Sequence, residues 1–351
     1  MAYDALLVVS FGGPESHDQV LPFLENVVRG RNVPRERLLE VAEHYYHFDG
    51  RSPINDQVRE LIAALRAEFE AHNVQLPIYW GNRNWHPFLA DTMRTMQGDG
   101  VRNALAFVTS AYSSYSGCRQ YRENIAAAQR ESGAPAPNVE KLRAFYNHPG
   151  FLAASAERLA MALQRVPEPA RGNVQVVYTA HSIPLSMASG CDYVKQLEEV
   201  RRLLSENLGV SNDALVYQSR SGPPGQPWLS PDILEHLHQV KEKGLATGVV
   251  LAPIGFLSDH LEVLYDLDVE ASELCKSLQL PMVRAETVGT HPRIIQMVRE
   301  LVEERTASGP RLALGVLGAR PDACAETCCP APQRPASTGP AATPQPVVGR
   351  T

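Results

Sequence analysis

Gly248 to Glu270 reads Gly-Val-Val-Leu-Ala-Pro-Ile-Gly-Phe-Leu-Ser-Asp-His-Leu-Glu-Val-Leu-Tyr-Asp-Leu-Asp-Val-Glu, which predicts a buried strand, a turn and a helix. The apolar residues 249–254 have the length and branching of a strand covered on both faces. Gly255, with Ser258 or Asp259, supplies the turn and a helix cap. This order of elements indicates an open α/β sheet, whose ligands bind at the carboxyl ends of the strands.

Charged side chains begin where this strand ends. Glu262, Asp266 and Glu270 are spaced i, i+4, i+8, which places three carboxylates on one helical face. A solvated acidic face is the plain alternative. The position directly after a buried strand favours a row of oxygen ligands for a divalent cation, headed by His260.

A second strand ends in a histidine. Residues 174–184 read Val-Gln-Val-Val-Tyr-Thr-Ala-His-Ser-Ile-Pro, with His181 just beyond the predicted strand Gln175 to Thr179. A lone histidine is more often structural than catalytic. Because His181 could face the acidic helix from a neighbouring strand, we expect it to act as a base or a metal ligand.

Strand-like and helix-like segments alternate along the chain, which predicts parallel sheets with helices on both faces. The clearest helices are Asn55 to Glu70 and Asp192 to Leu208, each with one apolar stripe. The other predicted strands are Ala5 to Ser10, Pro77 to Gly81, Ala104 to Ser110, Ala214 to Gln218, Gly248 to Ile254 and Pro281 to Ala285. We therefore predict two Rossmann-like domains, each a parallel sheet flanked by helices, with the active site in a crevice between them.

The domain boundaries follow from a break at His148-Pro149-Gly150 and from a change of composition after Ala319. We expect an N-terminal α/β domain over residues 1–148 and a C-terminal α/β domain over residues 149–319. A cysteine segment follows at 320–329. Residues 330–351 are rich in Pro and Ala and are expected to be disordered.

Composition limits the class of protein. The 351 residues carry a net charge of −6, and no run of Lys and Arg suggests a nucleic-acid surface. No apolar run is long enough to span a membrane, and the first strand begins without a signal sequence. We expect a cytoplasmic protein, and peripheral membrane contact through an apolar lip of the crevice is left open. The six cysteines do not suggest a disulfide framework.

Several motifs, in this order along the chain, closely resemble those of the ferrochelatases, which insert ferrous iron into a porphyrin. They are residues 7–14, 51–54, 81–87, 179–184, 216–223, 253–256 and 258–262, within a resemblance that covers about residues 3 to 308. The resemblance implies the chelatase fold, a porphyrin partner and Fe²⁺ as a substrate in haem biosynthesis. It places His181 and Glu262 on one side of the crevice.

The resemblance also suggests roles for these residues. We expect His181 to be the principal base or first metal contact, and Glu262 to be its partner in handling protons or metal. Asp266 and Glu270 extend a path for Fe²⁺ or protons, and relatives carry a π-helical turn here.

Residues near the ends of the N-terminal strands are expected to bind the porphyrin. Phe11 and Trp85 would wall the macrocycle, and Arg83 would meet a propionate; a well-packed turn is the alternative for residues 83–87. Bacterial ferrochelatases often carry Tyr at the position of Phe11, so an axial oxygen ligand is lost here. Further expected carboxylate contacts are Arg51, Ser52 and Tyr121.

Three cysteines lie within six residues of the tail: Cys324, Cys328 and Cys329. This density suggests metal or cluster ligation that needs a fourth thiolate, with structural zinc as the alternative. Many ferrochelatases hold a 2Fe-2S cluster with one ligand in a Tyr-Ser-Gly-Cys motif. The resemblance implies that Cys118 is that ligand.

Three other functions would account for some of these features. A zinc deaminase would share His260-x-Glu262 and clustered cysteines, but its Pro-Cys-x-x-Cys motif is missing. A related cobalt chelatase would share the fold, and a non-catalytic porphyrin or haem carrier would need neither base nor acidic row. The sequence leaves open the choice between protoporphyrin IX and coproporphyrin III, and the oligomeric state.

Overall fold

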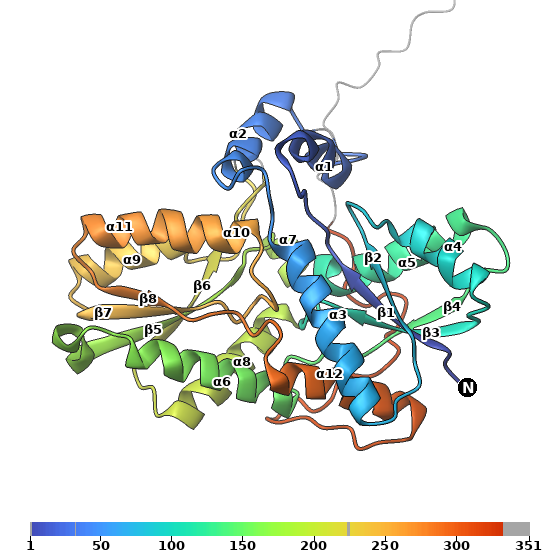
Figure 1. Cartoon of the computed structure of the whole chain (residues 1–351). Helices are drawn as coiled ribbons and strands as arrows, with labels where there is room; N and C mark the ends of the chain where they lie inside the picture. The colour runs from blue at the N-terminus through green and yellow to red at the C-terminus, as the bar shows by residue number, and fades with distance from the viewer. Residues whose placement is uncertain (1, 32, 223–224, 333–351) are drawn as a thin grey trace, which may run out of the picture.

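Two parallel four-stranded sheets, each flanked by helices, organise the computed structural model, which describes residues 2–31, 33–222 and 225–332 (Figure 1). The first sheet has the order β2-β1-β3-β4, and the second has the order β6-β5-β7-β8. The strands are β1 (Ala5–Ser10), β2 (Ile78–Asn82), β3 (Asn103–Val108), β4 (Asn138–Lys141), β5 (Val174–His181), β6 (Asp213–Gln218), β7 (Gly248–Ala252) and β8 (Met282–Arg284). The predicted α/β class and parallel sheets are confirmed.

Both sheets repeat one arrangement, in which the first strand of each series lies between the second and the third. Every residue of β1 and of β7 is buried, as expected for strands covered by helices on both faces. The strand predicted to reach Ile254 ends at Ala252 instead, because Pro253 has no N–H group for the ladder.

Helices fill the connections. They are α1 (Val20–Val27), α2 (Arg35–Tyr46), α3 (Ile54–Ala71), α4 (Leu89–Gly98), α5 (Gln120–Ser132), α6 (Pro149–Gln164), α7 (Leu185–Ala188), α8 (Tyr193–Leu208), α9 (Ile233–Glu242), α10 (Leu261–Val263), α11 (Ser272–Ser277) and α12 (Pro292–Thr306). Asp266 and Glu270 of the acidic row lie on a π-helix, η4 (Leu264–Ala271), and Glu262 precedes it in α10, which confirms the π-helical turn that the resemblance implied. A second π-helix, η2 (Tyr115–Arg119), precedes α5.

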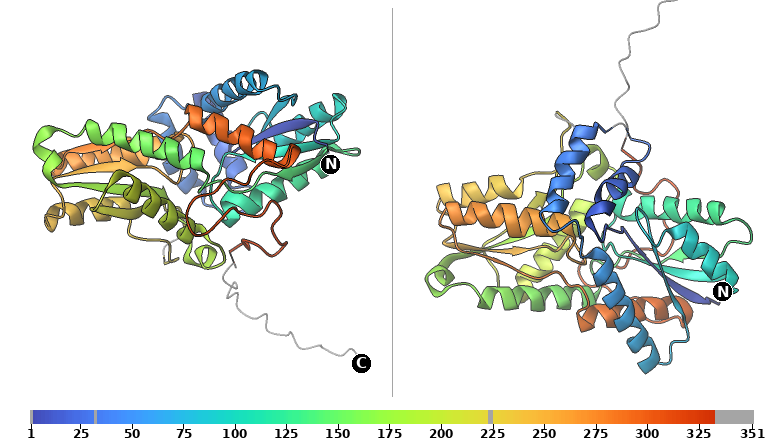
Figure 2. Two further views of the ribbon diagram at one scale, coloured as in Figure 1. Left: turned by 90° about the horizontal axis from the view of Figure 1, so that it is seen from below. Right: turned by 45° about the horizontal axis from the view of Figure 1, so that its top comes forward.

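One apolar cluster continues through both halves of the chain. It joins one face of β1 and β5 to the buried sides of α3, α6, α8 and α12. The views agree that α12, near the end of the described chain, lies beside α3 from the first half (Figures 1 and 2). Packing therefore fixes the two sheets relative to one another, and the domain division at residue 148 remains a proposal.

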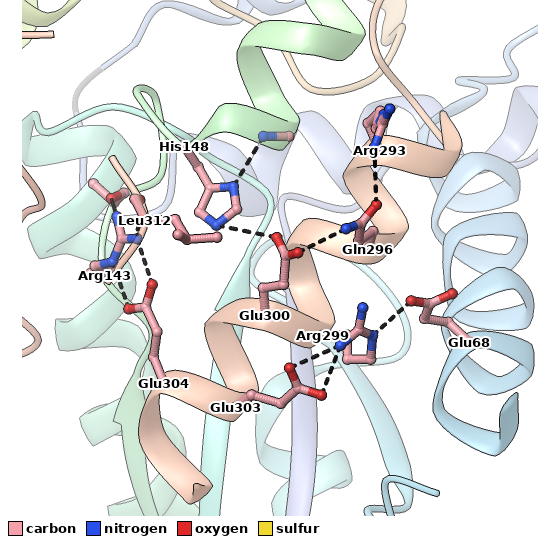
Figure 3. A network of polar contacts seen from close by, with 12 residues as sticks. Glu68, Arg143, His148, Arg293, Gln296, Arg299, Glu300, Glu303, Glu304 and Leu312 are labelled. Carbon is pink, nitrogen blue, oxygen red and sulfur yellow. Dashed lines mark hydrogen bonds and ion pairs between the residues drawn. The ribbon is translucent and has the colours of Figure 1, made fainter. Parts of the chain in front are cut away.

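Buried charges reinforce this junction (Figure 3). Arg143, just after β4, pairs with Glu304 of α12 at 2.7 Å, and both side chains are 1% exposed. Arg299 of α12 binds Glu68 of α3 and Glu303, each at 2.8 Å. The last long helix is thus joined to the first half by ion pairs as well as by apolar packing.

The tail continues from α12 without regular structure as far as residue 332, and the rest of the tail predicted to be disordered lies outside the described residues. Arg320 pairs with Asp192 at 2.9 Å, and Asn147 binds the carbonyl oxygens of Leu314 and Gly318. These contacts hold the segment before the cysteines against the body of the protein. In the described part of the chain, no helix is both long and apolar enough to cross a bilayer.

Candidate active site

His181 is the last residue of β5, beside Gln218 of β6. Its Nδ1 lies 2.5 Å from the carbonyl oxygen of Ser182. A carbonyl oxygen only accepts, so Nδ1 carries a proton and donates it to this bond. The other ring nitrogen, Nε2, faces the carboxylate of Glu262 at 3.4 Å. Nε2 is therefore the atom that gains or loses a proton.

Glu262 lies in the first turn of α10, just after the N-cap residue His260. Burial favours its neutral form, but the hydrogen bond from His181 and the charges of His181, His260 and His44 outweigh this and lower the pKa of Glu262 to about 2. Burial acts to lower the pKa of His181, yet Glu262, the Ser182 carbonyl and Asp266 raise it above 6.5. The side chains of His181 and Glu262 are 34% and 49% exposed, so a ligand can reach this pair.

Asp266 and Glu270 continue the acidic row along η4. The carboxylate of Asp266 accepts hydrogen bonds from Gln218 Nε2 at 3.2 Å and from the Ser219 hydroxyl. Burial, assisted by Glu262, raises the pKa of Asp266 to about 7. Burial and neighbouring acids also raise the pKa of Glu270. Glu262 is thus ionised at neutral pH, whereas Asp266 gains or loses a proton near pH 7.

The π-helix does not make this row a rigid metal site. Among residues 2–31, 33–222 and 225–332, no three His, Cys, Asp or Glu side chains are arranged so that they could hold a metal ion. The proposed metal role of His181, Glu262, Asp266 and Glu270 therefore remains a prediction.

Three of the predicted porphyrin contacts form one group. The guanidinium of Arg83 lies 5.7 Å from the ring centre of Phe11 and 4.5 Å from that of Tyr121. Arg83 also donates to Asn124 Oδ1 at 2.7 Å, so aromatic faces and an amide hold the cation. Phe11 and Trp85 each pack edge to face on Phe23 of α1, with ring centres 6.3 Å and 6.2 Å away. The two predicted walls thus lie on either side of one core residue.

Arg51 and Ser52 contact other residues than the group around Arg83. Arg51 pairs with Asp56 of α3 at 2.5 Å, and Ser52 is buried against Gly13. A Cβ atom on Gly13 would lie 2.8 Å from that of Ser52, so glycine is required for this close approach. Within the described chain, no hydrogen bond or ion pair joins either residue to the pair of His181 and Glu262, and their role in binding a carboxylate remains a prediction.

The four cysteines that were expected to share a cluster come close together. Cys118 of η2 and Cys328 influence the ionisation of both Cys324 and Cys329, whose pKa values are raised mainly by burial and further by these neighbouring thiols. The sulfur atoms of Cys328 and Cys329 are 3.5 Å apart. The four thiols lie close enough to affect one another, but they are not yet arranged as a set of ligands.

His44 was not predicted as part of the site. It comes from α2 in the first half of the chain, and its ring stacks on Tyr265 of η4, with centres 3.8 Å apart. The charge of Glu262 acts on His44, although burial and Arg37 together lower its pKa. α2, which shares an apolar cluster with Phe11 and Trp85, therefore also contacts Tyr265, the neighbour of Asp266 in η4.

Gln218 and Ser219 lie in one of the ferrochelatase-like motifs, and no contact was predicted for either. Ser219 has a φ of 61°, in the left-handed region, which aims its hydroxyl at Asp266. No spacing in the sequence reveals this contact, because β6 and η4 meet only in the fold.

The crevice between the two domains remains a prediction. One hollow of about 720 Å³ lies along α8 and is lined by residues that include Lys195, Arg201, Glu206 and Leu317. It contains none of the predicted site residues. The accessible face of the pair His181 and Glu262 is a better candidate for chemistry, because it combines a titrating imidazole with an ionised carboxylate.

Known proteins resemble this chain over nearly its whole length. A family model described as "Ferrochelatase" matches residues 3–306. A protein of Rhodopirellula baltica named "Ferrochelatase" is 54% identical over 340 residues, which cover 96% of each chain. One of Streptomyces coelicolor named "Coproporphyrin III ferrochelatase" is 50% identical over 361 residues, again 96% of each.

A solved structure titled "SirB from Bacillus subtilis with Fe3+" superposes with a TM-score of 0.55. It is 13% identical and covers 88% of this chain and 98% of its own. At that identity, the likeness supports the fold alone.

Proposed function

The chain belongs to the ferrochelatase family and is a metal chelatase, and on that premise we propose that it inserts Fe²⁺ into coproporphyrin III, with His181 as the base. The choice of this porphyrin rests on the relatives named coproporphyrin III ferrochelatase, among them that of Streptomyces coelicolor. The base is assigned from the geometry of its ring. Protoporphyrin IX is the competing substrate.

Metal insertion requires access to nitrogen lone pairs that point into the plane of a nearly flat ring. Phe11 and Trp85 offer a wall on which a macrocycle can stack, and Arg83 offers a cation for a propionate. Binding energy from the carboxylates and the apolar ring can offset the strain of tilting one pyrrole. We propose this as the role of the wall.

Two pyrrole protons must leave as the metal enters. His181 Nε2 accepts the first when the imidazole is neutral, while Nδ1 remains bound to the Ser182 carbonyl, and it accepts the second after the first has passed on to Asp266. The adjacent carboxylate of Glu262 stabilises the imidazolium that results. Because Glu262 raises the pKa of His181, the imidazole is a stronger base than a free one.

Asp266 and Glu270 are proposed to connect this pair with solvent. Asp266 has a pKa of about 7, so it can take a proton from the inner pair and release it outward at little cost. The same oxygens could pass Fe²⁺ inward. Replacing Asp266 with Asn separates the two roles, since the amide still offers an oxygen to the metal but no longer exchanges a proton.

The observation that carries the proposal is the fixed direction of His181 Nε2 toward Glu262 at 3.4 Å. The test is anaerobic Fe²⁺ insertion, followed optically, with coproporphyrin III and protoporphyrin IX in parallel. We expect turnover with coproporphyrin III at the higher kcat/KM. A higher value with protoporphyrin IX would reverse the substrate assignment, and tight binding of both without turnover would favour a carrier.

A 2Fe-2S cluster is a further part of the proposal. What supports it is that Cys118 and Cys328 influence the ionisation of both Cys324 and Cys329, so thiols from two separate parts of the chain lie near one another, although in the described chain they do not form a ligand set. Arg122 of α5 donates to the carbonyl oxygen of Cys324 at 3.3 Å and holds the tail against the body. When bound, such a cluster supplies one-electron redox chemistry or a cross-link between tail and body.

The compartment follows from the same thiols. All six cysteines lie in the described chain and none forms a disulfide there, which suits a reducing compartment. We therefore propose a cytoplasmic location.

The competing occupant of the four-cysteine group is structural zinc, which metal analysis of the purified protein distinguishes from iron.

A further inference from the structure

Two buried tyrosines bind main-chain carbonyl groups near the candidate pair of His181 and Glu262. One holds the end of β5, and the other holds the loop that leads from β7 to Glu262. Tyr193 opens α8 and is 6% exposed. Its hydroxyl donates a hydrogen bond to the carbonyl oxygen of His181 at 3.0 Å. The bond acts on the last residue of β5, so it fixes the backbone from which the His181 imidazole projects.

Tyr112 makes the corresponding contact on the other loop. It follows β3 in the first half of the chain and is 3% exposed. Its hydroxyl donates to the carbonyl oxygen of Ile254 at 2.9 Å, in a fully buried bond. Ile254 lies at the start of the segment that leads from β7 to Glu262. A residue from the first half of the chain therefore holds the segment that follows β7 of the second sheet.

The two phenols belong to one junction. Their rings meet edge to face, with centres 6.0 Å apart and an angle of 84°. One turn after Tyr193, the buried side chain of Gln196 accepts from the N–H of Ser113 at 2.8 Å and donates to the Ser113 hydroxyl at 2.9 Å. Residues 112–113 and 193–196 are thus joined by two hydrogen bonds and an aromatic contact.

The loop after β7 also contacts the end of β5. The N–H of Gly255 donates to the carbonyl oxygen of Thr179 at 3.0 Å. A Cβ atom on Gly255 would lie 2.6 Å from Ala180 Cα, so the loop after β7 is pressed directly against β5. A movement of either loop would therefore change the approach of His181 to Glu262.

We propose that Tyr112 and Tyr193 are positioning residues that set the distance between His181 Nε2 and the Glu262 carboxylate by anchoring the carbonyls of Ile254 and His181. Neither tyrosine is assigned a contact with porphyrin or metal. The inference rests on the proposed roles of His181 and Glu262, and it adds a cause for their alignment. It also makes the first half of the chain necessary for chemistry carried by the second.

The test uses Tyr193→Phe and Tyr112→Phe, which keep each ring and remove only its hydroxyl. The matched control is Tyr178→Phe, because Tyr178 is buried in β5 and its hydroxyl bonds to Ser205 at 2.9 Å on the side of α8, away from both loops. We expect kcat to fall about three- to tenfold in both test variants, the effect of one buried hydrogen bond. KM for the porphyrin should stay constant, and the control should keep the wild-type kcat.

Hydrogen exchange gives a readout that does not depend on turnover. Tyr193→Phe should increase exchange in peptides that span residues 181–190, and Tyr112→Phe in those that span residues 253–262, while the control leaves both unchanged. The inference is overturned if exchange in these segments is unaffected, or if all three variants lose kcat equally. If the wild-type protein does not turn over any porphyrin, the proposed function fails, and the exchange data alone decide whether the tyrosines hold the loops.

Discussion

His148 makes the free energy of unfolding depend on pH. The size of this dependence can be calculated, and a substitution of His148 should remove it. It is fully buried at the start of α6, where Nδ1 accepts from the N–H of Gly150 at 3.1 Å (Figure 3). Its Nε2 lies 3.6 Å from the carboxylate of Glu300. Burial, assisted by Arg143, lowers the pKa of His148 to about 3, against 6.5 for an exposed ring.

The sign and size of the effect follow from proton binding. Between pH 6.5 and pH 3 the unfolded chain binds a proton at this residue that the folded chain does not. Stability is therefore lost as the pH falls below 6.5, by about 1.4 kcal/mol per pH unit. From about pH 7 to about pH 5 the loss is about 2 kcal/mol, because only the part of this range below about pH 6.5 contributes at the full slope.

The perturbation is His148→Asn, since Asn also accepts a hydrogen bond at a helix N-cap but does not titrate. Urea unfolding at several pH values from about 7 to about 5 measures the free energy of unfolding for both proteins. The variant should lose up to about 2 kcal/mol less than the wild type over this range. Equal pH slopes would refute the reasoning, whatever constant offset the missing ring causes.

Three further substitutions test the site. Glu262→Gln should lower kcat at least about 100-fold, because the imidazolium loses its charged partner, and the pH–rate profile should move to lower pH as the pKa of His181 falls; an unchanged profile would contradict the pairing. Asp266→Asn should remove one ionisation near pH 7 and make the acid limb of that profile less steep, whereas an identical limb would exclude Asp266 from proton transfer. Cys118→Ser should lose bound iron and visible absorbance, and an unaltered spectrum would exclude this ligand set.

The sequence predicted the parts of the fold in which local patterns and tertiary packing agree. β1, β5 and β7 are apolar runs buried on both faces, and the stripe of α3 lies in the main core. β4 was missed because Asn138-Val139-Glu140-Lys141 has a single apolar residue and exists through pairing with β3 at the sheet edge.

In the candidate site, too, local sequence patterns predicted some residues, whereas others are brought in only by tertiary packing. His181 and Glu262 could be predicted because each closely follows a buried strand, whose carboxyl end faces the ligand. His44 could not, since it reaches Glu262 only through the packing of α2 on Tyr265. The substrate contact predicted for Arg51 is not tested by the fold, in which this arginine pairs with Asp56.

The central claim is that this chain inserts Fe²⁺ into a porphyrin with His181 as the base. It is tested most directly by anaerobic insertion into coproporphyrin III by the wild-type protein and by His181→Ala, with porphyrin binding measured for both. The account predicts turnover by the wild type, and a variant that binds porphyrin but loses nearly all insertion. Near wild-type turnover by the variant would contradict it.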